Sequence, residues 1–346
     1  MPEINIRNRK IGNKHKPLII TELGINHGGS LEQATNIAEV ALKSGAEVIK
    51  HQTHIVEDEM SEEAKSIIPE HTKESIYQII KKCSLSEEEE YKLMKFINDK
   101  GGIFISTPFS RKAVDRLEKF GVPAYKIGSG ECNNYPLVEY IAKLGKPVIL
   151  STGMNTIDSI KPSVNIFRKH NVNFALLHCT NIYPTPNRLV RLGAITKIQQ
   201  TFPDAVVGLS DHTKSIYTCL GAVALGASIL EKHFTDKLER VGPDISASMT
   251  PNELKILING SKQIYEALGD HKGPLNEEKS TISFAFASIV ATREISPGTI
   301  LSKENIFPRR PGGGDFGTKD YDFLFGKKAK KTIKAGSQIK KNDIEI

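Results

Sequence analysis

The segment Leu18-Ile-Ile-Thr-Glu22 is followed by an amphipathic stretch from Leu31 to Ser44 and then by Glu47-Val-Ile-Lys-His51, which together form one strand-helix-strand unit. The same alternation of short apolar runs and longer amphipathic stretches continues to about residue 268. It predicts eight strands: Leu18–Glu22, Glu47–His51, Ile103–Ser106, Ala124–Ile127, Val148–Ser151, Phe174–His178, Val206–Ser210 and Ser228–His233. Eight such units indicate an α/β protein of the (β/α)8, or TIM-barrel, class.

Helices are expected between the strands, several of them opened by a Ser or Thr that can cap free backbone amides. They include Leu31–Ser44, Ser110–Phe120, Thr156–His170 and Thr213–Leu225. The segment from Val56 to Lys100 is too long for one crossover and contains two helical patterns, near Glu74–Lys82 and Ser86–Asp99. We therefore expect an elaborated loop on the face where barrels of this class carry their active sites.

A polar stretch at residues 269–283 follows the last barrel helix, Pro251–Leu268, and has the composition of a linker. The chain thus divides into a catalytic barrel (1–268), a linker (269–283) and a second domain (284–346). In that domain, Arg293–Ile306 and Thr332–Ile344 share the pattern Ile-x-x-Gly-x-x-Ile/Leu-x-x-x-Asn/Asp-Ile, a weak internal duplication. So small a module has a marginal core, and we expect it to pack against a barrel.

Composition excludes several classes of function. The net charge is +7, but lysines alternate with acidic residues rather than forming a basic stripe, which argues against nucleic acid. No apolar run is long enough to cross a membrane, and the first residues lack the apolar stretch of a signal peptide. The four cysteines show no zinc spacing and are expected as reduced thiols. These features indicate a cytoplasmic enzyme.

Polar residues follow nearly every predicted strand, at the end where TIM barrels build their active sites. A single polar residue there usually caps or turns the chain, but the same explanation for all eight strands is much weaker. The candidates, in chain order, are Glu22, Asn26, Lys50, Gln52, Ser106, Thr107, Lys126, Ser129, Glu131, Ser151, Thr152, Asn181, Tyr183, Asp211, His212 and His233.

Two histidines end adjacent strands: His212 ends the seventh strand and His233 the eighth. Neighbouring imidazoles can converge on one metal ion and leave coordination positions open for water or substrate, which is typical of a catalytic metal site. The spacing of the histidines does not choose between manganese, zinc and iron.

Lys50 and Lys126 predict an anionic ligand, because their stems should leave the barrel core and bring two ammonium groups together above it. Hydroxyl and amide groups of Thr107, the Gly128–Gly130 turn and the Ser151–Gly153 turn would surround a phosphate with neutral donors. Glu22 and Glu131 remain as acid-base candidates, and Asp244 as an acceptor for sugar hydroxyls. The sequence has no strand-turn-helix context for an activated serine or cysteine, which disfavours covalent catalysis.

The chain resembles the bacterial N-acetylneuraminate (sialic acid) synthase family over essentially its whole length. The segments that carry the resemblance are Glu22-Leu-Gly-Ile-Asn-His-Gly-Gly29, Ile49-Lys-His-Gln-Thr-His-Ile-Val-Glu-Asp-Glu-Met60, Tyr125-Lys-Ile-Gly-Ser-Gly-Glu-Cys-Asn-Asn-Tyr135, Leu177-His-Cys-Thr-Asn-Ile-Tyr-Pro-Thr-Pro186, Gly208-Leu-Ser-Asp-His-Thr213 and Glu231-Lys-His-Phe-Thr-Asp236. The resemblance implies a TIM barrel followed by a small antifreeze-like (SAF) domain. It also implies a head-to-tail homodimer in which that domain covers the partner's active site.

The family's functional residues carry over position by position. Lys50, Thr107, Lys126, Ser129, Ser151 and Asn181 are expected to hold phosphoenolpyruvate. Gln52, Glu131, Tyr183 and Asp244 are expected on the open-chain amino sugar, together with Phe284 and, through the sugar's N-acetyl group, Arg310. Ser210 is expected as a further substrate-binding residue. His212 and His233 are expected to hold a divalent metal, usually Mn²⁺, with Mg²⁺ and Co²⁺ as alternatives. One departure is visible, because the family's Pro-Gly-Asn appears here as Pro69-Glu70-His71 and puts His71 in place of a site asparagine.

The reaction implied by this resemblance joins phosphoenolpyruvate, N-acetylmannosamine and water to give N-acetylneuraminic acid and phosphate, with cleavage of the C–O bond. The product would serve capsule or lipooligosaccharide biosynthesis. The nearest alternative is a legionaminic or pseudaminic acid synthase that uses a 2,4-diacetamido-trideoxy hexose. A metal-dependent aldolase or isomerase that ignores phosphoenolpyruvate is a second alternative, which the two lysines and the hydroxyl ring argue against. An inert barrel with an ice- or carbohydrate-binding module is the non-enzyme reading, and the module's charged surface suits it poorly.

Overall fold

The computed structural model describes residues 1–68 and 74–345 of the chain, which separates into two compact units, Met1–Leu268 and Gly269–Ile346. Each unit is described by itself. Among the described residues, no helix combines the length and the apolar character that spanning a membrane requires.

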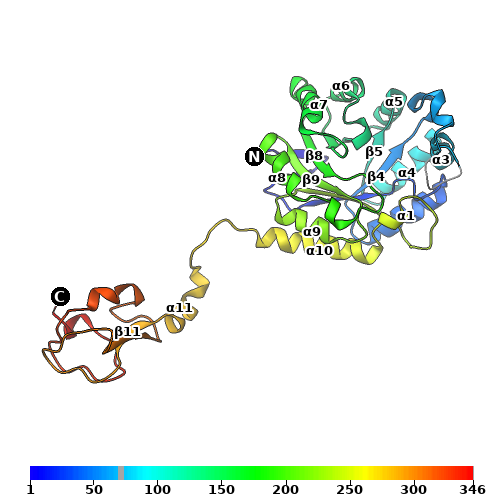
Figure 1. Ribbon diagram of the computed structural model, residues 1–346. Coiled ribbons are helices and arrows are strands. Elements are labelled where there is room, and N and C mark those ends of the chain that lie inside the picture. Colours follow the sequence, from blue (N-terminus) through cyan, green and yellow to red (C-terminus); the bar gives the residue numbers. More distant parts are fainter. Residues whose placement is uncertain (69–73, 346) are drawn as a thin grey trace. The chain divides into compact units, whose positions relative to one another are not determined.

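The first unit is a closed barrel of eight parallel strands surrounded by helices (Figure 1). The strand order around the barrel is β10-β3-β4-β5-β6-β7-β8-β9, so that β10 pairs with β3 and closes the sheet. The strands are β3 (Leu18–Glu22), β4 (Val48–Thr53), β5 (Ile103–Pro108), β6 (Tyr125–Ile127), β7 (Val148–Ser151), β8 (Phe174–Cys179), β9 (Val206–Asp211) and β10 (Ile229–His233). The predicted TIM barrel is confirmed.

Alternation along the strands separates the interior of the barrel from its outer face, because successive side chains of a strand point to opposite sides. The lower interior is filled by apolar side chains of every strand, such as Leu18, Ile20 and Ile149. Ile4, Ile6 and Ile11 pack into the same cluster; they belong to a hairpin of β1 (Ile4–Ile6) and β2 (Arg9–Ile11) that the sequence analysis did not predict. This hairpin closes the amino-terminal end of the barrel.

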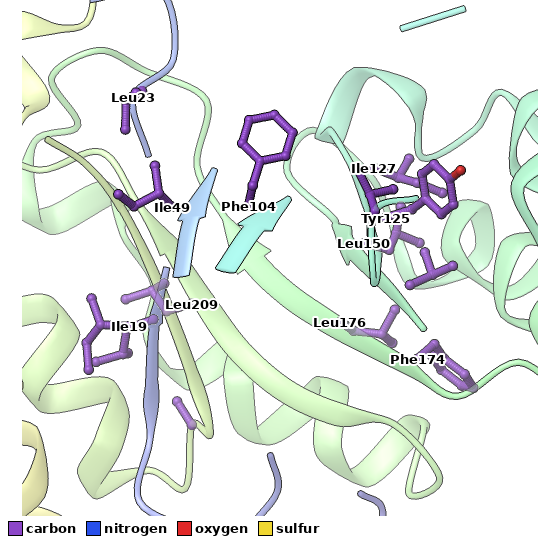
Figure 2. Packing of buried hydrophobic residues seen from close by; sticks show 14 of the residues in the cluster. Ile19, Leu23, Ile49, Phe104, Tyr125, Ile127, Leu150, Phe174, Leu176 and Leu209 are labelled. Carbon is purple, nitrogen blue, oxygen red and sulfur yellow. The ribbon is translucent and has the colours of Figure 1, made fainter. Parts of the chain in front are cut away.

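The alternate side chains of the strands, which point outward from the barrel, form the larger core between the barrel and its helices. Ile49, Phe104, Leu150 and Leu176 are all buried there (Figure 2). The surrounding helices are α1 (Leu31–Lys43), α4 (Glu87–Asp99), α5 (Arg111–Phe120), α6 (Tyr135–Ala142), α7 (Ile157–Lys169), α8 (Gly193–Thr201), α9 (Tyr217–Ala224) and α10 (Pro251–Ala267). Side chains of Ser30, Ser86, Ser110, Thr156 and Thr250 cap the first turns of α1, α4, α5, α7 and α10, which confirms the helix starts expected at Ser110 and Thr156. The start expected at Thr213 is wrong, because α9 begins at Tyr217 and has no side-chain cap.

The connection from β4 to β5 carries the predicted extension. It begins at the carboxyl end of β4 with α2 (Val56–Glu59) and a 3-10 turn, Glu62–Lys65, and continues into α3 (Ile76–Cys83) before the barrel helix α4. The two expected helices are therefore present. Each residue of the acidic run in α2 contacts a different element: Glu57 accepts from Lys81 of α3, Asp58 from the backbone N–H of Lys112 in α5, and Glu59 contacts His54.

The second unit contains α11 (Lys279–Ala285) and a two-stranded sheet of β11 (Ser288–Ala291) and β12 (Ile306–Arg309). The last residues of the expected linker (269–283) are helical, because α11 spans Lys279–Ala285, and this helix belongs to the second unit. The polar composition of that stretch concealed a short helix. The two copies of the internal repeat supply equivalent core residues, Ile295, Leu301 and Ile306 from one and Ile333, Ile339 and Ile344 from the other. Backbone bonds in both directions between Ile295 and Ile333 join the copies at the same repeat position.

Candidate active site

A pocket opens at the carboxyl ends of the barrel strands, and twelve of the residues predicted from the sequence line it. They are Glu22, Lys50, Gln52, Thr107, Lys126, Ser129, Ser151, Asn181, Tyr183, Ser210, His212 and His233. Because β-strand side chains alternate, most of these residues occupy interior positions directly above the apolar layers of the barrel. The same register that buries Leu18 and Ile20 thus presents Glu22 to the pocket.

The two lysines meet at a buried carboxylate. The Nζ atom of Lys50 lies 4.0 Å from Oε2 of Glu231, and the Nζ atom of Lys126 lies 3.6 Å from its Oε1. All three side chains are buried. Glu231 also accepts a 2.9 Å hydrogen bond from Ser210. The two ammonium groups therefore converge as predicted, with one shared counter-ion between them.

Glu22 provides a second carboxylate on the other side of Lys50. Its Oε2 lies 2.8 Å from the Lys50 ammonium, and its Oε1 accepts a 2.8 Å hydrogen bond from the amide of Gln52. Burial raises the pKa of Glu22 above its usual value, against the opposing attraction of Lys50. The pKa of Glu231 moves the other way, because the two neighbouring ammonium groups outweigh its burial. The site therefore holds one firmly ionised carboxylate and one that can exchange a proton near neutral pH.

Neutral hydroxyl groups surround the two lysines. The Nζ atom of Lys50 donates to the Thr107 hydroxyl at 3.1 Å, and that of Lys126 donates to Ser151 at 2.7 Å. The Ser129 hydroxyl accepts from the backbone N–H of Gly153 at 3.0 Å. Gly153 is required here, because a Cβ atom at this position would lie 1.8 Å from Oδ1 of Asn181. These groups together form a polar cradle of the kind that binds phosphate or carboxylate oxygens.

The histidine pair stands beside this cradle. The ring centroids of His212 and His233 are 5.5 Å apart, and Tyr183 stacks on His212 at 4.0 Å. Nδ1 of His212 contacts the carbonyl oxygen of Thr180 at 2.9 Å, which requires a proton on Nδ1 and leaves a free lone pair on Nε2. Burial lowers the pKa of His212 to about 4 and that of His233 to about 3, so both rings are neutral.

Neutral imidazoles with free lone pairs are the form that binds metal ions. Nδ1 of His233 is buried and has no hydrogen-bond partner among the described residues, although Oδ2 of Asp244 lies 3.7 Å away. The pair thus suits a two-histidine site with open coordination positions. Within residues 1–68 and 74–345, no group of three or more His, Cys, Asp and Glu side chains is arranged to hold a metal ion.

Eight of the predicted residues that the structure describes fall outside the lining of the pocket. Four of them, Asn26, Ser106, Thr152 and Asp211, form hydrogen bonds within the barrel unit instead. Asp244 packs behind His233, and Glu131 accepts a 2.6 Å hydrogen bond from Asn134. Burial raises the pKa of both carboxyls. Arg310 and Phe284 belong to the second unit, where both are exposed and where a 3.1 Å bond from the N–H of Gly312 to the carbonyl of Ser283 joins their segments. His71 lies outside the described residues.

Sequence reasoning missed three residues of the pocket: Glu231, Cys179 and Phe109. Glu231 was concealed by its position inside an apolar strand rather than at its end. A signal was available, since Glu231 lies two residues before His233 and must share its inward face. Cys179 was expected as a reduced thiol; its thiol lies 3.4 Å from Oδ1 of Asn181, and burial raises its pKa to about 11. It is therefore a neutral lining group.

The fold and the site define an α/β-barrel protein with an anion-binding pocket beside a histidine pair, joined to a small second unit. The model of the NeuB family matches residues 37–273, and that of the SAF domain matches residues 286–345. The chain therefore belongs to the NeuB family, and the resemblance noted from its sequence is confirmed. The second unit is its SAF domain.

Individual relatives cover nearly the whole chain. An N,N'-diacetyllegionaminic acid synthase of Campylobacter jejuni is 38% identical over 94% of this chain and 99% of its own length. The human N-acetylneuraminate-9-phosphate synthase is 32% identical, covering 96% of this chain and 93% of its own length. Among solved structures, an N-acetylneuraminic acid (sialic acid) synthetase of Leptospira borgpetersenii in complex with citrate superposes with a TM-score of 0.74 at 33% identity, covering 81% of this chain and 95% of that one. These relatives indicate an enzyme of the condensing kind and leave its sugar undecided.

Proposed function

We propose that this protein condenses phosphoenolpyruvate with the open-chain form of N-acetylmannosamine to give N-acetylneuraminic acid and phosphate. The observation that carries the proposal is the pairing, in one pocket, of two buried lysines with two neutral histidines. A metal-dependent aldolase or isomerase that ignores phosphoenolpyruvate would not need the two lysines. A protein that only binds an anion would not need the two neutral histidines.

Phosphoenolpyruvate would lie in the cradle of Lys50, Lys126, Thr107, Ser129 and Ser151. Its phosphate and carboxylate groups would replace the internal bonds that Thr107 and Ser151 now accept from the lysines. Charge-assisted hydrogen bonds of this kind fix orientation as well as providing affinity. Since Glu231 stays ionised between the ammonium groups, it would keep them in place when the ligand leaves.

His212 and His233 are the residues that would hold a divalent ion, which we propose is Mn²⁺, with Mg²⁺ and Co²⁺ as alternatives. A bound divalent ion supplies Lewis acidity toward a carbonyl oxygen, worth several kcal/mol of charge stabilisation. The chain itself contributes the geometry, because the carbonyl of Thr180 fixes His212 and the stacked ring of Tyr183 covers it. The aldehyde of the sugar would therefore approach beside Tyr183.

The chemical steps can be written with the groups in the pocket. A bond forms between C3 of phosphoenolpyruvate and the aldehyde carbon at the expense of the C2–C3 double bond, which leaves a cation at C2 and a negative charge on the aldehyde oxygen. Water adds at C2 and gives one proton to Glu22, which passes it on to the aldehyde oxygen. The bond between C2 and the phosphate oxygen then breaks as the C2 hydroxyl loses its second proton, and that proton leaves with the phosphate. A carboxyl whose pKa is raised by burial suits this proton transfer near neutral pH.

The second unit would complete the site in a homodimer. We propose that Arg310 and Phe284 of a partner copy reach the sugar, Arg310 through its N-acetyl group. Both side chains are exposed and their segments are hydrogen-bonded to one another, so they are available as one contact surface. We also propose a cytoplasmic location and a role in supplying sugar for capsule or lipooligosaccharide.

A second candidate sugar is 2,4-diacetamido-2,4,6-trideoxymannose, which would make the protein a legionaminic acid synthase. The 38% identity to the Campylobacter synthase of that name favours it. Phosphate release from phosphoenolpyruvate by chelator-treated, manganese-reloaded protein, with the two sugars compared side by side, decides between them. Faster release with N-acetylmannosamine supports the main proposal, faster release with the trideoxy sugar supports the second, and no release with either refutes the condensation.

A further inference from the structure

A histidine-carboxylate pair, His54 and Glu59, lies next to Gln52 and does not belong to the described lining of the pocket. His54 is buried just after the end of β4, and its Nδ1 lies 2.8 Å from Oε2 of Glu59 in α2. Its Nε2 lies 3.2 Å from Oε1 of Gln52. Gln52 lines the pocket and donates from Nε2 to Glu22. An unbroken hydrogen-bonded chain thus runs Glu59–His54–Gln52–Glu22.

The direction of each bond in this chain fixes the protons on His54. The amide of Gln52 donates from Nε2 to Oε1 of Glu22, which lies beside Lys50, and its oxygen faces Nε2 of His54. Nε2 of His54 then faces an acceptor and needs a proton. Nδ1 faces the Glu59 carboxylate, another acceptor, and needs a proton as well. Both ring nitrogens of His54 thus face acceptor oxygens, one from Glu59 and one from Gln52.

The surroundings hold this pair in one geometry. Glu59 belongs to a four-residue helix whose other two acidic residues bond to α3 and α5, so the carboxylate has a fixed support. Phe109, which also lines the pocket, stacks on the ring of His54 with centroids 4.4 Å apart and an interplanar angle of 11°. The ring of His54 therefore has little freedom to turn.

We propose that His54 and Glu59 form a positioning dyad that locks the orientation of the Gln52 amide. The amide of a glutamine can rotate by half a turn with little change in shape, and in the reversed orientation its oxygen would repel Glu22. An N–H donor of His54 behind the amide oxygen excludes that orientation. The dyad thereby keeps an N–H group on Glu22 and fixes the face that Gln52 presents to the sugar. This inference rests on the proposed function for the meaning of Gln52 and Glu22 in catalysis.

Two substitutions of similar size separate positioning from simple packing. His54→Gln places an amide nitrogen near the position of Nε2 and can still donate to Gln52, whereas His54→Asn places its nitrogen near Nδ1 and cannot. Both lose the ring that stacks on Phe109. We expect His54→Asn to have a kcat about tenfold or more below that of His54→Gln. The KM for phosphoenolpyruvate should change less than about twofold in either variant, because the lysine cradle is untouched.

The matched control is His170, which contacts Oε1 of Glu139 at 3.0 Å at the end of α7. Its Gln and Asn variants should have equal kinetics. If His54→Asn and His54→Gln lose activity equally while the KM for phosphoenolpyruvate is kept, His54 acts by packing alone and the proposal is overturned.

A measurement without substrate separates this inference from the proposed function. In protein labelled with ¹⁵N-histidine, His54 should show protons on both ring nitrogens at neutral pH, assigned by the loss of its signals in His54→Gln. A neutral His54 with a single N–H would overturn the dyad even if the enzyme makes sialic acid. A doubly protonated His54 in a protein that releases no phosphate would leave the dyad standing and refute the condensation instead.

Discussion

Substitution of Glu231 by Gln should destabilise the barrel more than any other change that preserves side-chain shape in the pocket. In the native chain, two buried lysines are balanced by two buried glutamates, Glu22 and Glu231, and Glu231 is the one placed between both lysines. The variant keeps the size of the side chain and the hydrogen bond from Ser210. It leaves one positive charge in the interior without a partner.

The expected loss is about 3 kcal/mol of unfolding free energy, the lower end of what is found when one partner is removed from a buried ion pair. For a unit of this size that corresponds to roughly 6 °C in Tm. The effect should depend on pH in a defined direction. Because the folded-state pKa of Glu231 is lowered, its contribution is fully present at neutral pH and is lost as the pH falls below about 4.

Urea denaturation at pH 7, followed by far-ultraviolet circular dichroism, measures the loss. Glu139→Gln is the matched control, since Glu139 pairs with Lys169 at the surface and exposed pairs contribute little. Phosphoenolpyruvate should raise the Tm of Glu231→Gln more than that of the wild type, because the ligand supplies the missing negative charge. A variant as stable as the wild type would refute the view that Glu231 holds the lysines.

Three further predictions address the base, the histidines and the hairpin. Glu22→Gln should bind phosphoenolpyruvate with unchanged affinity in calorimetry but release phosphate at least about 100-fold more slowly; unchanged turnover would remove its role as base. His233→Gln should retain less than a tenth of the wild-type affinity for Mn²⁺, measured by metal analysis after equilibrium dialysis, and equal retention would place the metal elsewhere. Ile6→Ala should lower the unfolding free energy by about 2–5 kcal/mol in urea, whereas Ile256→Ala on the exposed face of α10 should cost far less; equal losses would show that the hairpin does not seal the barrel.

The fold was predictable because local patterns determine it. Each of the eight predicted strands is an apolar run that the barrel buries on both faces, so its hydropathy is visible without knowledge of its partners. The hairpin of β1 and β2 was not predictable in the same way. Its three-residue strands are too short to show a period, and Ile4 and Ile6 acquire their meaning only from the open end of the barrel that they fill.

The site was predictable wherever a polar residue ends a strand. Lys50 and Gln52 lie two residues apart and both enter the pocket, whereas His51 between them points outward and contacts Glu90 of α4. The inward direction of Glu231 follows from its spacing to His233, but the roles of Glu231 and His54 could not be assigned from the sequence. The role of Glu231 depends on two lysines from distant strands, and that of His54 on the orientation of a neighbouring amide, which are properties of the folded molecule.

The hairpin of β1 and β2 can reach its final packed position only late in the synthesis of this chain. Ile4 and Ile6 are synthesised before all the barrel strands, and the interior that receives them is closed only when β10, Ile229–His233, has been synthesised and has paired with β3. At roughly 5–20 residues per second, the hairpin waits on the order of ten seconds or longer as an exposed apolar segment. During synthesis these apolar residues therefore stay without their final burial until the last strand of the barrel arrives.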